Sequence, residues 1–242
     1  MDSKATGLSL SLGMLAAIVG YVLWVTAIGF NTKSDDVVTI LNNSASGSTI
    51  LQIASLLVLV GLVIHGAGLI STRGTAAGSN ESLGIVCIIS GIVIWLTSSG
   101  LGISLAEMGE KFVEYSQGAA AATAGGNAAA AATAGAAATS VSIAAGFAQS
   151  ASVASNTFGT ILAGIGWVFL GLAYRGSDAE GFLSFIPLGW LALLQGAVLL
   201  VGTIIIGNVV DVDTGSQISG IGFLLIVFWS VLRGAKLVKD SK

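Results

Sequence analysis

The segment from Ser82 to Gly100 reads SLGIVCIISGIVIWLTSSG and contains no charged side chain. An α-helix needs about 20 apolar residues to cross the hydrocarbon core of a bilayer, and this segment is close to that length. A strand of a membrane β-barrel would be about 10 residues long and would alternate apolar with polar positions. The segment is longer and apolar on every side, so it predicts a transmembrane helix.

Five further stretches share this character, and all six lack charged residues except near their ends. They predict an all-α integral membrane protein with six transmembrane helices. The predicted spans cover residues 8–30, 50–70, 83–106, 157–174, 186–208 and 218–238.

The composition excludes several other classes of protein. Charged residues make up 9% of the 242 residues, against about 25% in an ordinary soluble domain. The hydrophobic fraction is 54% and the mean hydropathy is +0.94, which excludes a disordered chain. A single cysteine cannot form an intrachain disulfide scaffold. A net charge of −3 does not suit a nucleic-acid-binding protein.

Basic residues gather in one of the two sets of segments that connect the spans. This set comprises both termini and residues 71–82 and 175–185, and it holds all but two of the basic residues; the exceptions are Lys33 and Lys111. Because cytoplasmic loops carry an excess of Lys and Arg, we expect both termini to be cytoplasmic. Residues 107–156 are then on the outer side, and we expect the host to be a prokaryotic cytoplasmic membrane.

The first and third spans are similar to each other at a shift of 71 residues. Nine positions of 11–29 recur in 82–100, including a Ser-Leu-Gly start and a Trp-x-Thr pair. The fifth span follows more weakly at a shift of 176, and residues 61–66 align with 171–176. We interpret the chain as three helical hairpins of the same orientation, covering 1–82, 83–176 and 177–242. The alternative is chance similarity among helices rich in Gly and Leu.

The longest connection, residues 107–156, consists mostly of Ala, Gly, Ser and Thr. Alanine is the best helix former, although Gly125, Gly126 and Gly135 weaken a continuous helix. We expect a helical extramembrane arm that packs on a partner subunit, since small residues permit close approach. A flexible low-complexity loop and a buried re-entrant segment are the alternatives.

Carboxylates recur after the odd-numbered spans and are the candidate ligands for a cation, because oxygen ligands suit Ca²⁺ or Mg²⁺. Solvated helix ends are the favoured interpretation of the same residues, so we predict no metal site. The candidates are Asp35, Asp36, Glu107, Glu110, Asp211 and Asp213.

Three even-numbered spans end in a cationic or imidazole residue followed by glycine: His65, Arg175 and Arg233. We interpret these side chains as anchors at the cytoplasmic interface. A proton relay through His65 is the alternative, but no carboxylate partner lies within the spans.

Glycines within the spans allow close contact between helices, or with a lipid or pigment. No cofactor is predicted from them. The glycines predicted to pack helices are Gly13, Gly20, Gly84, Gly91, Gly189 and Gly196.

No catalytic motif is recognisable in the chain, and no acid, base and nucleophile are grouped within a span, so we do not expect an enzyme. Our leading hypothesis is a structural or accessory subunit of a membrane complex, in contact with the bilayer and with other subunits or copies of itself. A small transporter or channel for a neutral solute or a cation is the alternative.

Overall fold

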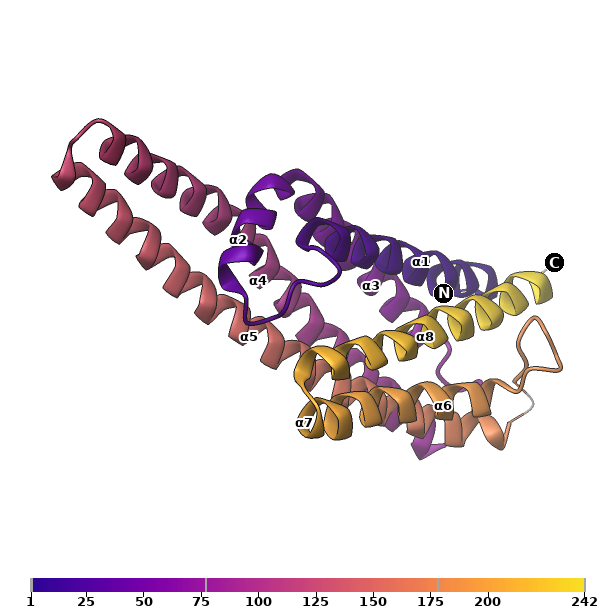
Figure 1. The fold of residues 1–242 in the computed structure, drawn as a ribbon. Coiled ribbons are helices and arrows are strands. Elements are labelled where there is room, and N and C mark those ends of the chain that lie inside the picture. Colours follow the sequence, from indigo (N-terminus) through magenta and orange to yellow (C-terminus); the bar gives the residue numbers. More distant parts are fainter. Residues whose placement is uncertain (1, 77, 178, 242) are drawn as a thin grey trace. The chain divides into compact units, whose positions relative to one another are not determined.

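The structure is a computed structural model that describes residues 2–76, 78–177 and 179–241, and the part of the chain so described is helical with no strand (Figure 1). The elements in order are α1 (Ser3–Ile28), α2 (Val37–Ser46), α3 (Ser48–Ser71), α4 (Ser79–Ala124), α5 (Ala128–Arg175), α6 (Leu188–Leu200), the π-helical turn η1 (Val201–Ile206), α7 (Gly207–Val209) and α8 (Val212–Asp240).

Among the described residues, six helical segments are long and apolar enough to cross a membrane. They are α1, α3, α4, α5, α8 and the continuous stretch Leu188–Val209. The prediction of six membrane-spanning helices is confirmed at this level. The fifth begins at Leu188, two residues later than predicted, because Pro187 takes the N-cap position.

Local chemistry explains where several helices begin and end. Gly29 follows α1 with a φ of 100°, and Gly126 lies in the turn between α4 and α5 with a φ of 73°. Glycine adopts this left-handed conformation without steric cost. The side chain of Asn127 then accepts a hydrogen bond from the amide of Ala130 at 3.0 Å and caps the start of α5.

Residues 107–156 are helical except at positions 125–127, so the helical interpretation of this arm is confirmed. Two of the glycines expected to weaken the helix, Gly125 and Gly126, lie in the turn, whereas Gly135 lies within α5. The outer ends of α4 and α5 form an antiparallel hairpin (Figure 1). A Cβ atom at Gly118 would lie 3.9 Å from that of Ala134.

The chain divides into two compact units. Unit 1 comprises Met1–Val19, Leu57–Leu96 and Ser155–Lys242, and unit 2 comprises Gly20–Leu56 and Thr97–Ala154.

In unit 2, α2 is a helix that the hydropathy pattern did not predict. It is only 10 residues long, too short for a membrane span, and it buries Ile40 and Leu41. Its position is held by the Asn43 side-chain amide, which donates to the carbonyl oxygen of Ile28 at 2.6 Å. A Cβ at Gly109 of α4 would lie 2.5 Å from the Leu41 carbonyl oxygen, so α4 and α2 approach closely.

In unit 1, α1 and α3 cross at a reciprocal glycine contact. A Cβ added to Gly13 would lie 2.5 Å from the His65 amide nitrogen and 2.8 Å from the Gly61 carbonyl oxygen. A Cβ added to Gly61 would lie 2.5 Å from the amide nitrogen of Ala17 and 2.6 Å from the Gly13 oxygen. The backbones therefore touch at a distance that only glycine permits.

The helices α4 and α5 repeat this geometry within unit 1. A Cβ at Gly84 would lie 2.8 Å from the Gly166 oxygen and 2.8 Å from the Leu170 nitrogen. A Cβ at Gly166 would lie 2.7 Å from the Gly84 oxygen and 2.8 Å from the Ile88 nitrogen. In both pairs, each glycine meets a glycine carbonyl and the amide four residues beyond it.

The other side of α5 makes the same kind of contact with α6. A Cβ at Gly171 would lie 2.8 Å from the Gly189 oxygen and 2.7 Å from the Leu193 nitrogen. A Cβ at Gly189 would lie 2.6 Å from the Arg175 nitrogen. Glycine thus sets the distance between neighbouring helices at three crossings of unit 1.

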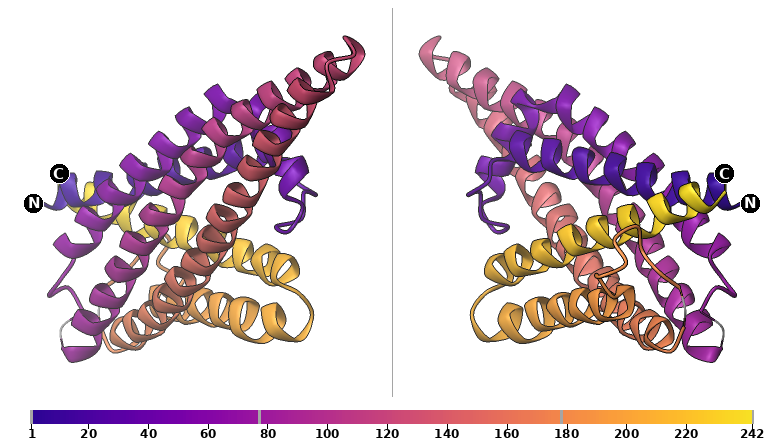
Figure 2. Two further views of the ribbon diagram at one scale, coloured as in Figure 1. Left: turned by 90° about the vertical axis from the view of Figure 1, so that its left-hand side faces the viewer. Right: turned by 90° about the vertical axis from the view of Figure 1, so that its right-hand side faces the viewer.

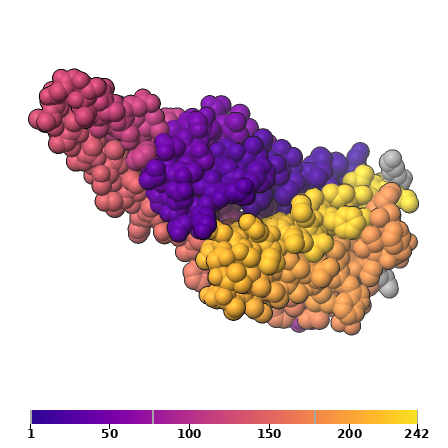
Figure 3. Space-filling view, in the orientation of Figure 1, coloured from indigo at the N-terminus to yellow at the C-terminus, as the bar shows by residue number. Residues whose placement is uncertain are grey.

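The helices α6 and α8 lie side by side and antiparallel in both views of Figure 2, and their surfaces meet in the space-filling view of Figure 3. Aromatic rings fill the interior of unit 1. Trp167 and Trp229 are almost fully buried and meet edge to face at 5.0 Å, and Tyr174 meets Trp229 at 5.5 Å. The Trp229 indole N–H donates to the Leu188 carbonyl oxygen at 3.2 Å.

Candidate functional site

A polar region lies in unit 1, at the ends of the helices that are predicted to face the cytoplasm. It begins with Glu81 in the first turn of α4, whose side chain is 1% exposed. The carboxylate accepts hydrogen bonds from the amides of Gly74 at 2.6 Å and Ala76 at 2.9 Å. Glu81 thereby holds the turn that follows α3, and its charge is also favourable near the N-terminus of α4.

Tyr174 joins this turn to the end of α5. Its hydroxyl lies 3.0 Å from the hydroxyl oxygen of Thr75, which also donates weakly to Glu81 at 3.4 Å. Because Tyr174 is 3% exposed and packs on Trp229, the phenol is fixed in position. The polar turn is therefore coupled to the aromatic core of unit 1.

Arg233 of α8 is the buried cation of this region, with 6% of its surface exposed. Its Nη1 donates a hydrogen bond to the Glu180 carbonyl oxygen at 2.9 Å, and the guanidinium carbon lies 5.8 Å from the Tyr174 ring centroid. The segment that contains Glu180 is held nearby, because the Phe182 amide donates to the Leu232 carbonyl oxygen at 2.8 Å. Within the described part of the chain, the buried Nε of Arg233 has no hydrogen-bond partner.

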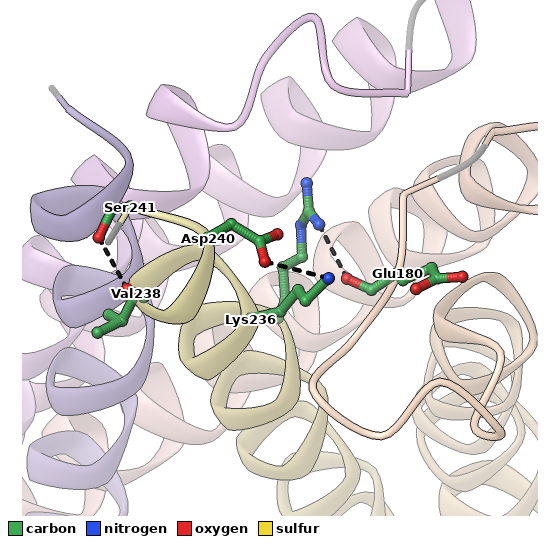
Figure 4. Close-up of polar contacts among 6 residues, drawn as sticks. Glu180, Lys236, Val238, Asp240 and Ser241 are labelled. Carbon is green, nitrogen blue, oxygen red and sulfur yellow. Dashed lines mark hydrogen bonds and ion pairs between the residues drawn. The ribbon is translucent and has the colours of Figure 1, made fainter.

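These groups surround a pocket of about 580 Å³. Its lining includes Arg233, Lys236, Asp240 and Glu180, together with the hydroxyl groups of Thr75 and Ser177. Lys236 forms an ion pair with Asp240 at 3.1 Å (Figure 4). The pocket therefore offers fixed cationic and hydroxyl donors at one end of unit 1.

The three predicted interfacial anchors have different surroundings. Arg175 is exposed, and its guanidinium lies 4.2 Å from the ring centroid of Trp190, an arrangement that suits a headgroup region. His65 is buried, and its Nδ1–H donates to the Leu10 carbonyl oxygen at 3.2 Å. His65 and Arg233 are instead buried, and each side chain donates a hydrogen bond to a backbone carbonyl of a neighbouring segment.

Two of the predicted carboxylates cap helices. Asp36 accepts from the Thr39 amide at 3.1 Å at the start of α2, and Asp211 accepts from the Thr214 amide at 2.7 Å at the start of α8. Both carboxylates therefore belong to the start of a new helix and not to the end of the odd-numbered span that precedes it. They begin the next helix, where a negative charge is favourable.

The remaining candidate carboxylates do not form a shared cluster. Asp35, Glu107 and Glu110 are exposed residues of unit 2, whereas Asp213 lies beside Asp211 in unit 1. Among the described residues, no three His, Cys, Asp or Glu side chains are placed to hold a metal ion.

The predicted packing glycines lie at helix contacts in unit 1, apart from Gly20, which is buried at the start of unit 2. Gly13, Gly84 and Gly189 form the crossings described above. Gly91 faces the Gly159 carbonyl oxygen and Gly196 faces that of Gly164, each at 2.7 Å from an added Cβ.

The buried polar residues that the sequence analysis did not single out include Glu81 and Gln195. Glu81 precedes the third span and looks like an ordinary loop acid; its one signal is its place in the first turn of a helix. Gln195 lies within the fifth span and is fully buried, with neither side-chain atom hydrogen-bonded. An amide in the middle of an apolar span is a visible signal, because such a group is costly in lipid.

Comparisons with protein-family models, with characterised proteins and with solved structures find no match to this chain. Any functional conclusion therefore rests on the residues and their geometry.

Proposed function

We propose that the chain is a structural or accessory subunit of a multi-subunit membrane complex, with the arm of residues 107–156 as a contact surface. The observation that carries this proposal is a pair of large apolar side chains on the arm. Ile143 is 70% exposed and Phe147 is 79% exposed, and they are one turn apart on α5. Residues four apart share a helix face.

The length of α5 separates this pair from the predicted membrane span. The helix has 48 residues, and the predicted span occupies 157–174. At a rise of 1.5 Å per residue, Phe147 lies about 15 Å before the start of that span. The pair is then beyond the hydrocarbon, where exposed apolar groups indicate a surface that another protein covers.

The small residues of the arm suit the same role. Burying a side chain such as phenylalanine contributes about 1.5–3 kcal/mol, and the surrounding alanines allow a partner helix to approach closely. Either another subunit or a second copy of the chain would cover these apolar side chains.

We still interpret the six spans as three related helical hairpins. The crossings at Gly13/Gly61 and Gly84/Gly166 support it, since each glycine meets a carbonyl and the amide four residues on. In the first and third spans, the contacting residues 13 and 17 correspond to 84 and 88, which is the 71-residue shift found in the sequence. In the second and fourth spans, Gly61 corresponds to Gly166, five residues before the position that the alignment of 61–66 with 171–176 would give.

The test is to purify the protein in mild detergent and to measure its assemblies by native mass spectrometry. We expect a complex that Phe147→Ser and Ile143→Ser weaken. Phe185→Ser is the matched control, because Phe185 is 78% exposed and lies outside the arm. A monomeric wild-type protein, or equal loss in the control, would refute the proposal.

We also propose that both termini are cytoplasmic and that the arm is on the outer side of a prokaryotic cytoplasmic membrane. Because Cys87 is the sole cysteine, a Cys87→Ser background allows labelling at single introduced sites. A membrane-impermeant maleimide should label Ala131→Cys on intact cells, and Ser241→Cys only after permeabilisation. The reverse pattern would invert the topology.

A further inference from the structure

Arg233 is a buried cation that forms no ion pair with any carboxylate of the described residues. It is 6% exposed, and no carboxylate of the described residues lies within 4.0 Å of its guanidinium. Charged side chains within a membrane nearly always pair with one another or with backbone carbonyls, or they face the bundle interior or a water-filled cavity, and they often mark functional sites. Its guanidinium donates a hydrogen bond to the neutral Glu180 carbonyl, and no other described residue satisfies its Nε.

The cavity that Arg233 faces has the size and the donors of an anion site. Its volume of about 580 Å³ falls within the range of about 300–1,000 Å³ that is common for small-ligand sites. Lys236, three residues further along α8, also lines it, as do Thr75 and Ser177. Two cationic side chains of α8 therefore lie at this pocket, and the second of them, Lys236, is paired with Asp240.

Neither of the two acidic residues described in the lining, Asp240 and Glu180, forms an ion pair with Arg233. Asp240 is engaged by Lys236 at 3.1 Å. Glu180 offers its backbone carbonyl to Arg233, and in Figure 4 its carboxylate is turned away from the Lys236–Asp240 pair. Among the described lining residues, Arg233 is therefore the cationic side chain that has no ion-pair partner.

We propose that this pocket binds a phosphate group, with Arg233 and Lys236 as its cationic ligands. Arginine presents planar, forked donors that match phosphate oxygens, and its charge-assisted hydrogen bonds are stronger than neutral ones. The pocket lies at the end of α8 where the apolar span gives way to the basic tail, which is the depth of phospholipid headgroups. Basic pockets between transmembrane helices at this depth bind anionic headgroups. The phosphate can therefore come from a phospholipid or from a soluble phosphate, and the inference does not depend on the proposed role as a subunit.

The experiment uses the full chain purified in detergent. Native mass spectrometry measures retention of phosphatidylglycerol against a galactosyl diacylglycerol that lacks phosphate, and calorimetry measures binding of inorganic phosphate. The variants are Arg233→Gln and Lys236→Gln. Lys239→Gln is the matched control, since it removes the same charge from α8 but does not line the pocket.

We expect selective retention of phosphatidylglycerol, weakened at least about tenfold by Arg233→Gln and about fivefold by Lys236→Gln, with the control unchanged. Binding of inorganic phosphate with the same dependence on the variants, without lipid retention, would support the proposal and identify a soluble source. If Arg233→Gln fails to fold, Lys236→Gln decides, because the Lys236 side chain is 28% exposed and is therefore less buried than that of Arg233.

Three results would overturn the proposal: binding of neither phosphate compound, equal retention of the lipid that lacks phosphate, or equal loss in Lys239→Gln.

Discussion

The crossing of α4 and α5 offers the sharpest test of the packing in unit 1. In Gly84→Ala, the added Cβ would lie 2.8 Å from both the Gly166 oxygen and the Leu170 nitrogen. Both are backbone atoms, so no side chain can rotate to make room. The ordinary Cα···O contact distance is about 3.3–3.6 Å, and the helices must therefore separate by about half an ångström or more.

The expected loss follows from two effects. Overpacking a close contact costs about 1–3 kcal/mol, and each weak Cα–H···O contact that is lost removes a further 0.5–1 kcal/mol or so. We expect Gly84→Ala to lower the free energy of unfolding by about 2–3 kcal/mol, which corresponds to a fall of about 4–12 °C in Tm for a chain of this length.

The assay is thermal unfolding in detergent, followed by circular dichroism at 222 nm. Gly100→Ala is the control on the same helix, because a Cβ there would meet nothing within 4 Å. Alanine should stabilise the helix at that position by about 0.5–1 kcal/mol. The double variant Gly84→Ala/Gly166→Ala should lose less than the sum of the single losses, since both residues belong to one contact. Wild-type stability in Gly84→Ala, or an equal loss in Gly100→Ala, would show that the reasoning is wrong.

Three further predictions concern buried or capping polar groups. Gln195→Leu should raise the free energy of unfolding by about 1–3 kcal/mol in the same thermal assay, because it removes a buried amide that has no hydrogen-bond partner among the described residues. A loss of stability would indicate that the amide is hydrogen-bonded in the folded protein. Glu81→Gln should speed hydrogen exchange of the Gly74 amide by at least about tenfold, because a glutamine side chain has one acceptor oxygen where the carboxylate uses two. Unchanged exchange would mean that the turn is stable without this carboxylate. The hydrogen bonds with Thr39 hold the pKa of Asp36 below its usual value, so this cap is intact at neutral pH and is lost as the pH falls through that lowered pKa; a carboxyl titration by NMR that gives a raised pKa would contradict the capping geometry.

The helical spans were predictable because lipid cannot satisfy backbone hydrogen bonds, so a long apolar stretch must be a helix. The arm was predictable in part, since alanine favours a helix and consecutive glycines interrupt it, as they do at Gly125 and Gly126. The helix α2 was missed because a stretch of 10 residues is decided by its cap at Asp36 and its packing against α4, which hydropathy does not measure.

The charged groups of the candidate site show a similar division. Arg233 was singled out by its recurrence at a helix end, but its burial follows from the segment around Glu180 that folds over it. Glu81 carried almost no signal, because the turn that it binds lies in the preceding loop and is recognised only through its backbone amides.

The scarcity of charge and the six apolar stretches were enough by themselves to determine an all-helical chain with six segments able to cross a membrane, because the solubility of a segment in lipid depends on its own side chains. They also identified small residues along the helices. Only the tertiary structure decided which helices these residues join. Gly166 and Gly171 are five residues apart on α5 and point about 140° apart around its axis, so one meets α4 and the other meets α6. Hydropathy is nearly the same at both positions, whereas the choice of neighbour depends on the shapes of two surfaces and on the backbone groups of helices far away in the chain.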